Sequence, residues 1–421
     1  MGETVVVPLQ ELVTSLSINP NGHHVVLAAK RGLFLLDLTT PFAPPIAFKH
    51  NTKWEVTDVI WNPHPQHSSW IASTSNQKVL IWNVDPTGSM SLSNSLASAS
   101  SAANTSASVS NGSTPTPSTP AAHTSKAFRT SINTPDAFRT ASTRVNPLIN
   151  PSSMPQNQNV EIVLHVHKRA VSDFHWSPFR SEVIATCGYD NFVHVWDLRT
   201  RSGSTSSTTS DDGNPHSETG VPGRSGMALV LSKPDVSFCS WTSGATAVKW
   251  NRVSEYMLAS SHDTDLRVWD TRFGSKEVSL ITAAHMTKIY GIDWSPRSPE
   301  EIITCSQDQC VKLWNIRETR KCEGTIMTNS PVWRARFTPF GNGIVTMPLR
   351  KENELTMWGL GDSFAGENVA TFTGHTDVVK EFVWRNCGDN EYQLVTWSKD
   401  QTLRLWPIDR KIQIAIGHKP L

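Results

Sequence analysis

The sequence FVHVWD at residues 192–197 recurs in altered form as DLRVWD at 265–270 and as CVKLWN at 310–315. Each copy is a short run of β-branched and aromatic residues that ends in Trp followed by Asp or Asn, which is typical of a packed strand. Further copies are KVLIWN at 78–83, LTMWG at 355–359 and TLRLWP at 402–407. From Trp269 to Trp406 these tryptophans are 45, 44 and 48 residues apart. That spacing is close to the period of about 40 to 45 residues of one four-stranded propeller blade.

A second strand pattern lies upstream of each of these runs. It ends in Trp or Phe, which Ser, Thr or Asn and then Pro often follow. The copies are TDVIWNP at 57–63, SDFHWSP at 172–178, TAVKW at 246–250, YGIDWSP at 290–296, WRARFTP at 333–339 and KEFVW at 380–384. A weaker first copy, Thr14–Ile18, precedes LFLLDL at 33–38, where Leu36 stands in place of Trp. The two patterns together predict seven blades.

The predicted fold class is therefore all-β, a seven-bladed β-propeller that forms one domain over residues 1–421. The blades are expected near residues 12–50, 54–166, 167–232, 241–283, 285–328, 331–373 and 375–407. The N-terminal run at residues 4–7 has no blade of its own. We expect it to form the outer strand of the last blade, which would close the ring and cover an exposed strand edge. The run at residues 412–416 is an alternative for that role.

Two low-complexity stretches lengthen the spacing between Trp82 and Trp269. Residues 86–158 are rich in Ser, Thr, Asn, Pro and Ala, and residues 199–226 are rich in Ser, Thr, Gly and Asp. Neither stretch can bury enough apolar surface to offset the entropy lost on ordering. Both are therefore predicted to be disordered insertions between the third and fourth strands of their blades.

The longer insertion contains candidate regulatory elements. Thr114, Thr116, Thr119 and Thr134 each precede proline, as a proline-directed kinase requires. The sequence AFRT occurs twice, at 127–130 and 137–140. This repeat is interpreted either as a short docking motif or as drift in an unconstrained loop.

Three blades carry His, Thr, Asp and Trp at nearly fixed separations, with Thr ten and Asp six residues before Trp. The sets are His167, Thr186, Asp190 and Trp196; His285, Thr304, Asp308 and Trp314; and His375, Thr396, Asp400 and Trp406. One set alone would resemble a hydrolase charge relay. Its repetition favours a structural network, because a chain of hydrogen bonds from indole to carboxylate satisfies four buried polar groups in each blade.

Composition argues against several functional classes. A net charge of +1 and a pI near 7.7 provide no electrostatic footprint for nucleic-acid binding. No apolar stretch approaches the length of about 18 to 20 residues that spans a bilayer, so direct membrane insertion is not expected. The six cysteines show no CxxC pair, which favours reduced cytosolic thiols.

Catalytic and metal-binding motifs are also missing from the sequence. His165, His167, His175 and His194 lie on or beside alternating strands without a Cys or carboxylate at metal-ligand spacing. The chain contains no GxSxG, no GxxxxGK[ST] and no GxGxxG after a strand. We therefore expect no catalytic residue, no metal and no cofactor.

Partner binding is expected on the rim formed by the loops that enter the innermost strands. The residue four positions before each inner Trp or Phe lies at this rim. These residues are Thr57, Ser172, Thr246, Tyr290, Trp333 and Lys380. Tyr290 and Trp333 are the aromatic candidates of the type that dominates interface energetics, and the alternative is that they fill the channel.

The repeats resemble the WD-repeat family, and several stretches resemble one branch of it more specifically. The most specific are KWEVTDVIWNPH at 53–64, HMTKIYGIDWSP at 285–296, VWRARFTPFGNGIVT at 332–346, and GHTDVVKEFVWR with EYQLVTWSKDQTLRLW across 374–406. They are similar to the N-terminal propeller of the family of WD-repeat protein fifty-nine and fungal SEA complex subunit three. The resemblance covers every blade and is lost only in the two insertions.

The resemblance implies a non-enzymatic scaffold in the SEA complex, called GATOR in animals, which relays amino-acid status to TOR complex 1. Its partners would be other SEA or GATOR subunits and the machinery that regulates Rag GTPases. The protein would be cytoplasmic and would reach the vacuole or lysosome through these partners. Family members continue beyond the propeller into an RWD domain, a helical region and a zinc-binding module, whose functions are not transferred to this chain.

A different class of function remains open. Substrate receptors of cullin-type ubiquitin ligases use a WDxR box on one propeller face. WDLR at 196–199 and WDTR at 269–272 both fit that box.

Overall fold

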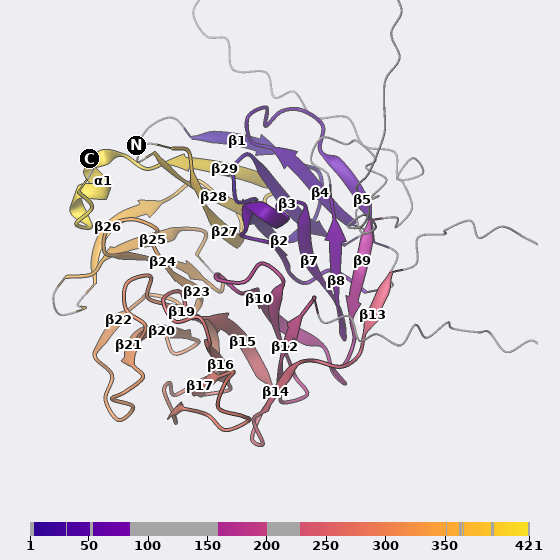
Figure 1. Ribbon diagram of the computed structural model, residues 1–421. Helices are drawn as coiled ribbons and strands as arrows, with labels where there is room; N and C mark the ends of the chain where they lie inside the picture. The colour runs from indigo at the N-terminus through magenta and orange to yellow at the C-terminus, as the bar shows by residue number, and fades with distance from the viewer. Residues whose placement is uncertain are drawn as a thin grey trace, which may run out of the picture. The chain divides into compact units, whose positions relative to one another are not determined.

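The computed structural model describes residues 4–30, 32–50, 54–84, 159–199, 228–350, 352–361, 364, 366–388 and 391–419. Over these residues the chain forms seven β-sheets arranged around a ring (Figure 1). Each sheet contains four strands that pair antiparallel in order from the centre outward, and one sheet carries an added fifth strand. The predicted all-β, seven-bladed propeller is confirmed.

The first strand of each sheet lies innermost, and most neighbouring first strands contact one another around the ring. These strands are β2 (Val13–Ile18), β6 (Val59–Trp61), β10 (Val171–Trp176), β15 (Ala245–Trp250), β19 (Ile289–Trp294), β23 (Val332–Phe337) and β27 (Val379–Asn386). The second strands are β3 (His24–Ala29), β7 (Trp70–Ser75), β11 (Val183–Gly188), β16 (Met257–His262), β20 (Glu301–Ser306), β24 (Gly343–Pro348) and β28 (Tyr392–Ser398).

The third strands carry the repeated Trp. They are β4 (Gly32–Asp37), β8 (Lys78–Asn83), β12 (Phe192–Asp197), β17 (Asp265–Asp270), β21 (Cys310–Asn315), β25 (Leu355–Gly359) and β29 (Thr402–Pro407). The outer strands are β5 (Ile46–Lys49), β9 (Val160–Leu164), β14 (Val236–Cys239), β18 (Ser279–Ile281), β22 (Gly324–Met327), β26 (Glu367–Phe372) and β1 (Val5–Pro8). A short 3-10 helix, η1 (Pro65–His67), links β6 to β7.

Apolar side chains of neighbouring sheets pack against each other around the ring. The described residues form seven buried clusters, each of which combines side chains from two adjacent blades. Between the third and fourth blades, for example, Phe238 stacks on Trp269 with ring centroids 4.9 Å apart. Burial between blades therefore stabilises the ring, because no single sheet covers both of its own faces.

The tryptophans that end the inner strands also link the blades by hydrogen bonds. The Trp250 indole donates to the carbonyl of His175 in the preceding blade at 3.1 Å, and the Trp294 indole donates to that of Lys249 at 3.0 Å. Trp176 makes the same contact with the Ile60 carbonyl at 3.3 Å. This repeated bond explains why the inner pattern ends in Trp, since an indole buries a large apolar ring and still satisfies its N–H.

The boundary expected near residue 232 for the third blade is wrong. The strand β13 (Leu229–Leu231) pairs in parallel with β9 and so adds a fifth strand to the second blade. The third blade instead obtains its outer strand from β14, which pairs antiparallel with β12. Side-chain packing accounts for this, because Leu231 is buried with the cluster of the second and third blades, whereas Phe238 is buried with that of the third and fourth.

The last blade is completed by the N-terminal strand. β1 pairs antiparallel with β29, with Val5 opposite Leu405 and Pro8 opposite Thr402. The run at 412–416 does not take this role, because residues 410–415 form the helix α1 (Arg410–Ala415). Ile416, which caps this helix, is buried with side chains of the sixth and seventh blades.

Residues 86–158 and 200–226 lie outside the described residues, so the predicted disorder of the two insertions is not tested. The same holds for Thr114, Thr116, Thr119 and Thr134 and for both AFRT sequences. Arg199 alone of the second stretch is described.

Candidate partner-binding face and channel

The structure brings together all four members of each His, Thr, Asp and Trp set. In the blade of His285, the imidazole Nδ1 lies 2.9 Å from the Asp308 carboxylate, and Nε2 lies 2.7 Å from the Thr304 hydroxyl. The Trp314 indole donates to the same hydroxyl at 2.9 Å. The sets that contain His167 and His375 repeat this geometry.

One assignment of protons satisfies all of these contacts. In it the Thr304 hydroxyl accepts from the indole and donates to Nε2 of His285, and Nδ1 of His285 donates to Asp308. Burial raises the pKa of Asp308, but hydrogen bonds from His285 and from backbone N–H groups outweigh this and lower the pKa below its usual value. Each set is therefore a chain of satisfied, buried polar groups.

The same indole-to-hydroxyl bond occurs in three further blades that the sequence pattern missed. Trp82 donates to Ser73 at 2.9 Å, Trp269 to Ser260 at 2.8 Å, and Trp358 to Thr346 at 2.9 Å. In the blades of Trp82 and Trp269 the hydroxyl belongs to a Ser nine residues before Trp, and in the blade of Trp358 it belongs to a Thr twelve residues before Trp, so neither spacing matches the Thr ten residues before Trp. In the fourth blade, His262 completes the chain from strand β16, because its Nε2 lies 2.8 Å from the Ser260 hydroxyl.

One group of described side chains offers three atoms that a metal ion could share. Ligand atoms of His167, Asp190 and His194 lie within 4.8 Å of one another. Both ring nitrogens of His167 are already bonded to Asp190 and Thr186, and Nδ1 of His194 lies 2.9 Å from the Ser237 hydroxyl. Burial and the neighbouring His167 lower the pKa of His194 to about 3. The donor set is therefore engaged in hydrogen bonds, and a metal would have to break a structural network to bind.

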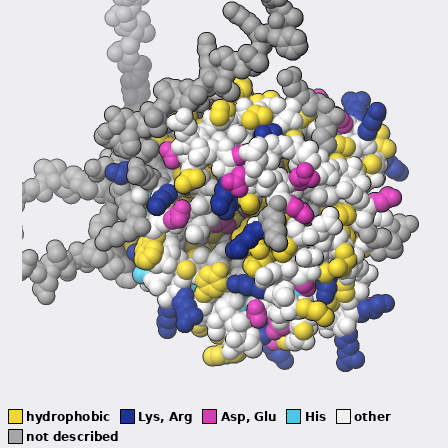
Figure 2. Space-filling view, turned by 180° about the vertical axis from the view of Figure 1, so that it is seen from behind, with side chains coloured by type: hydrophobic (Ala, Val, Ile, Leu, Met, Phe, Trp, Pro, Cys, Tyr) yellow, Lys and Arg dark blue, Asp and Glu magenta, His cyan; other side chains and the backbone are white. Residues whose placement is uncertain are grey.

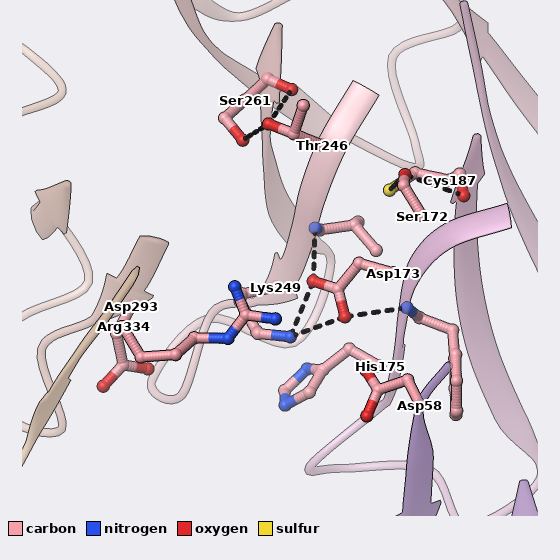
Figure 3. Close-up of polar contacts among 12 residues, drawn as sticks. Asp58, Ser172, Asp173, His175, Cys187, Thr246, Lys249, Ser261, Asp293 and Arg334 are labelled. Carbon is pink, nitrogen blue, oxygen red and sulfur yellow. Dashed lines mark hydrogen bonds and ion pairs between the residues drawn. The ribbon is translucent and has the colours of Figure 1, made fainter. Parts of the chain in front are cut away.

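Sequence reasoning missed a charged network that lines the channel. Several inner strands carry a charged side chain one or three positions before their terminal Trp or Phe, and Figure 3 shows Asp58, Asp173, Lys249 and Arg334 gathered together. The carboxylates are Asp58, Asp173, Asp293 and Glu381, and the cations are Lys249, Arg334 and Arg336. Asp173 lies 2.8 Å from the Lys249 ammonium, and Glu381 lies 3.0 Å from the Arg336 guanidinium.

Several channel side chains also bind the backbone of the next blade. The backbone N–H of Trp250 donates to Nδ1 of His175 at 3.1 Å, and that of Phe337 donates to Asp293 at 2.9 Å. The N–H of Val248 donates to Asp173 at 2.9 Å. Burial and the cations near it lower the pKa of His175 well below its usual value, in agreement with its role as an acceptor. The channel network therefore holds neighbouring blades in register.

Among the channel carboxylates, Asp58 is the one without an ion pair in the described part of the chain. It accepts a hydrogen bond from the Ser15 hydroxyl at 2.6 Å and has no ion pair closer than 4.0 Å among the described side chains. Burial and the charges of Asp173 and Glu381 raise the pKa of Asp58 to about 6. Its carboxyl group therefore changes charge close to neutral pH.

The six predicted rim residues comprise three hydroxyl side chains, an aromatic pair and a lysine. The hydroxyls of Ser172 and Thr246 bind the carbonyls of Ala245 and Ile289 in the following blade at 2.7 and 2.9 Å. Thr57 is exposed, and its hydroxyl lies 2.8 Å from that of Thr74. These three side chains are thus tied to the fold.

Tyr290 and Trp333 form the aromatic pair, and both are half-buried. Their ring centroids lie 5.1 Å apart, and the Arg334 guanidinium lies 4.7 Å from the Trp333 ring. Lys380, the sixth rim residue, is half-buried, and burial together with the charge of Lys399 lowers its pKa. The structure therefore places an aromatic pair beside a cation at the mouth of the channel.

Large exposed side chains also lie on other loops at this end of the sheets. Trp241 is 88% exposed in the loop before β15, and Met286 is 92% exposed in the loop before β19. Tyr189, in the turn between β11 and β12, is 44% exposed, and the Lys288 ammonium lies 5.4 Å from its ring. Loops that enter first strands and turns between second and third strands lie at the same end of antiparallel sheets.

We call this end of the ring the leading face and define it by Tyr189, Trp241, Met286, Tyr290 and Trp333. Exposed aromatic and Met side chains gathered on one face are characteristic of protein-interaction surfaces. Figure 2 shows one face of the ring, on which apolar, basic and acidic side chains are interspersed around the middle.

The arginines of both WDxR sequences form ion pairs within their own blades. The guanidinium of Arg199 donates bidentate hydrogen bonds to the Asp197 carboxylate, and that of Arg272 does the same to Asp270. The Arg272 guanidinium also lies 4.6 Å from the Tyr256 ring. Both arginine side chains remain more than half exposed, at 60% and 53%.

None of the six cysteines, all of which are described, is part of a disulfide. Burial raises the pKa of Cys187 and Cys305, so these thiols are poor nucleophiles. No helix in the described part of the chain is long and apolar enough to cross a membrane.

Comparison with known proteins agrees with the repeat and the ring. The family model of the WD domain, G-beta repeat, matches residues 44–83, 158–197, 233–270 and 277–315. Together with the seven four-stranded blades, this match places the chain among the WD-repeat β-propellers.

Three relatives define the branch. The chain is 33% identical over 94% of its length to maintenance of telomere capping protein 5 of Saccharomyces cerevisiae. It is 31% identical over 98% of its length to the human GATOR2 complex protein WDR59. It is 33% identical over 98% of its length to a Schizosaccharomyces pombe protein described as an uncharacterized RWD, RING finger and WD repeat-containing protein. The chain is therefore a WD-repeat homologue of these proteins over nearly its full length, and it spans 25% to 32% of their lengths.

Proposed function

We propose that this chain is a non-enzymatic scaffold subunit of an assembly of the SEA or GATOR2 type, which positively regulates TOR complex 1 signalling in response to amino acids. The observation that carries the proposal is the similarity to a GATOR2 complex protein over 98% of the chain. In this role the protein is cytoplasmic and reaches the surface of the vacuole or lysosome through its partners. Those partners are other subunits of the assembly and, through them, the machinery that regulates Rag GTPases.

The leading face supports a scaffold role. Trp241 and Met286 are almost fully exposed, and a large apolar side chain in water is stabilised when a partner covers it. The polar sets that resemble catalytic groups are instead buried and internally satisfied, as those of His285 and His375 illustrate. Ser172 and Thr246 hold the blades behind this face in place.

Affinity purification of the tagged chain from its own cells tests the proposal. We expect SEA-type subunits to copurify with the wild-type chain and to be lost with the triple variant Trp241→Ala, Met286→Ala and Tyr290→Ala. The matched control is Phe273→Ala, because Phe273 is 67% exposed but follows β17 at the opposite end of the blades. Recovery of SEA subunits that does not depend on the leading face would refute the assignment of the binding surface.

The alternative is a substrate receptor of a cullin-type ubiquitin ligase. It is favoured by the exposure of Arg199 and Arg272 in the two WDxR sequences. The double variant Arg199→Ala and Arg272→Ala separates the two functions. Loss of a ligase adaptor in this variant, with no SEA subunits recovered from the wild type, would replace the proposed function with the alternative.

Amino-acid signalling requires a second measurement. Cells that lack the chain are expected to show reduced phosphorylation of TOR complex 1 substrates when amino acids are restored after starvation. The leading-face triple variant should fail to restore this phosphorylation, and Phe273→Ala should restore it. Normal phosphorylation without the chain would contradict the signalling role.

A further inference from the structure

A recess opens between the fifth and sixth blades at the end of the ring opposite the leading face. Its volume is about 540 Å³. The turn at residues 295–298 lines one side, the turn at 341–343 lines the other, and side chains of β21 and of the loop after β25 lie between them. Both turns connect a first strand to a second strand, which places them at the end away from the start of the inner strands.

The recess interrupts packing that is closed elsewhere in the ring. Leu313 lies one residue before the repeated Trp of its third strand and is only half-buried. The corresponding side chains of the other six blades are all buried, at 5% exposure or less: Leu35, Ile81, Val195, Val268, Met357 and Leu405. The opening is therefore specific to this junction.

Local sequence explains the opening. Phe337 stands where five other blades have the larger Trp, so its ring fills less of the space between the blades. Gly341 and Gly343 line the far side with backbone alone, because Ile416 fills the positions where their Cβ atoms would lie. Phe364 forms an apolar wall and packs against Gly324 of the neighbouring blade, where a Cβ atom would overlap its ring.

The charges at the recess select a ligand. The carboxylates of Glu301 and Glu323 line it, and the described residues offer neither side chain a hydrogen bond or an ion pair. The one cation in the lining, Arg297, donates to the carbonyl of Gly341. The Asn342 amide is likewise occupied, since it donates to the Leu360 carbonyl at 2.8 Å. An apolar floor with two unpaired carboxylates complements an apolar side chain beside a positive charge.

We propose that this recess binds an extended peptide of a partner protein in which a large apolar side chain is followed directly by Lys or Arg. The apolar side chain enters between Leu313, Phe337 and Phe364. The cation pairs with Glu301 and Glu323 at the edge. The recess is remote from the leading face, so this contact does not compete with partners that bind there.

The test measures fluorescence polarisation of labelled hexapeptides with the full chain. We expect GSFKSG to bind with a dissociation constant below about 1 mM. The charge-reversed peptide GSFESG should bind at least about tenfold more weakly, and the truncated peptide GSAKSG should show no saturation. Equal binding of GSFKSG and GSFESG, or no binding of GSFKSG, would overturn the proposal.

Variants locate the binding to the recess. The double variant Glu301→Gln and Glu323→Gln should weaken GSFKSG by at least about fivefold and leave the binding of GSFESG no weaker. Glu318→Gln is the matched control, because Glu318 is an exposed carboxylate of the same blade outside the recess. Phe337→Trp fills the recess with the residue found in five other blades and should abolish binding without loss of folding. Unchanged binding in Phe337→Trp would assign the peptide to another surface.

Discussion

The His, Thr, Asp and Trp sets and the lining of the channel are both polar networks inside the ring, but only the first repeats. The three sets join the same atoms in three blades, with His Nε2 at 2.7 to 2.9 Å from the Thr hydroxyl. The positions three before the last residue of the inner pattern differ in nearly every blade: Ser15, Asp58, Asp173, Ala247, Gly291, Arg334 and Glu381. The repeated network therefore stabilises individual blades. The channel network instead joins different blades, as the ion pairs of Asp173 with Lys249 and of Glu381 with Arg336 show.

Breaking the channel network should have the largest effect on stability. Asp173→Ala removes the partner of the Lys249 ammonium and the acceptor of the Val248 N–H. We expect a loss of about 3 kcal/mol in the free energy of unfolding, measured by urea denaturation, because a buried charge is left unpaired. The double variant Asp173→Ala and Lys249→Met should recover most of the loss. A double variant as unstable as the single one would show that the ion pair is not the cause.

Removing one of the repeated Thr hydroxyls should lower the free energy of unfolding by less than Asp173→Ala does. Thr304→Val keeps the shape of the side chain but leaves the Trp314 indole N–H and Nε2 of His285 without their hydrogen-bond partner. The expected loss is about 2 kcal/mol, within the range for buried polar groups left unsatisfied. Thr186→Val and Thr396→Val should give losses equal to within about 0.5 kcal/mol, since their partners have the same geometry. Unequal losses would contradict the equivalence of the three blades.

Titration of Asp58 should distinguish the channel from the repeated sets. Its pKa in the folded protein is raised to about 6, above the usual value of 3.8, so the folded state holds a proton that the unfolded state has lost between about pH 4 and pH 6. Stability contributed by this group is present at low pH and is lost as pH rises through about 6. Asp58→Asn should therefore be more stable relative to wild type at pH 7 than at pH 4.5, by about 1 to 2 kcal/mol. An identical difference at both pH values would contradict the raised pKa.

The smallest effect is expected at the leading face. Trp241→Ala should change the free energy of unfolding by less than about 0.5 kcal/mol, because the side chain is 88% exposed and packs little. The thermal midpoint of this variant should match that of Phe273→Ala. A large loss would mean that Trp241 serves the fold rather than a partner.

Repetition determined how much of the molecule could be predicted from its sequence. The ring and the sets around His167, His285 and His375 were predictable because their spacing recurs. The equivalent chain through Ser260 and His262 was missed because His262 comes from the second strand instead of the preceding loop. The outer strand of the third blade was misplaced because residues 229–231 and 236–239 are both short apolar runs, and only packing decides between them.

The candidate sites were less predictable because they depend on positions that do not repeat. Five of the sixteen tryptophans lie at neither repeated position: Trp54, Trp70, Trp241, Trp333 and Trp397. Only Trp333 was singled out from sequence, because it lies four residues before Phe337, whereas Trp241 lies nine residues before Trp250. Asp58, Asp173 and Arg334 were not predicted, because the alternating pattern that identifies a strand is read from its apolar residues and does not distinguish the charged residues between those apolar positions. The recess at Leu313 had no sequence signal beyond Phe in place of Trp at residue 337.

The pairing of β1 with β29 constrains how the protein is made. Val5 leaves the ribosome 400 residues before its partner Leu405 exists. At about 5 to 20 residues per second, the N-terminal strand waits some 20 to 80 seconds for the other half of its sheet. By the end of that interval six blades are complete and the ring is still open, and unpaired strand edges of this kind promote aggregation. The order of synthesis therefore leaves the edge of the ring exposed until its last strand emerges.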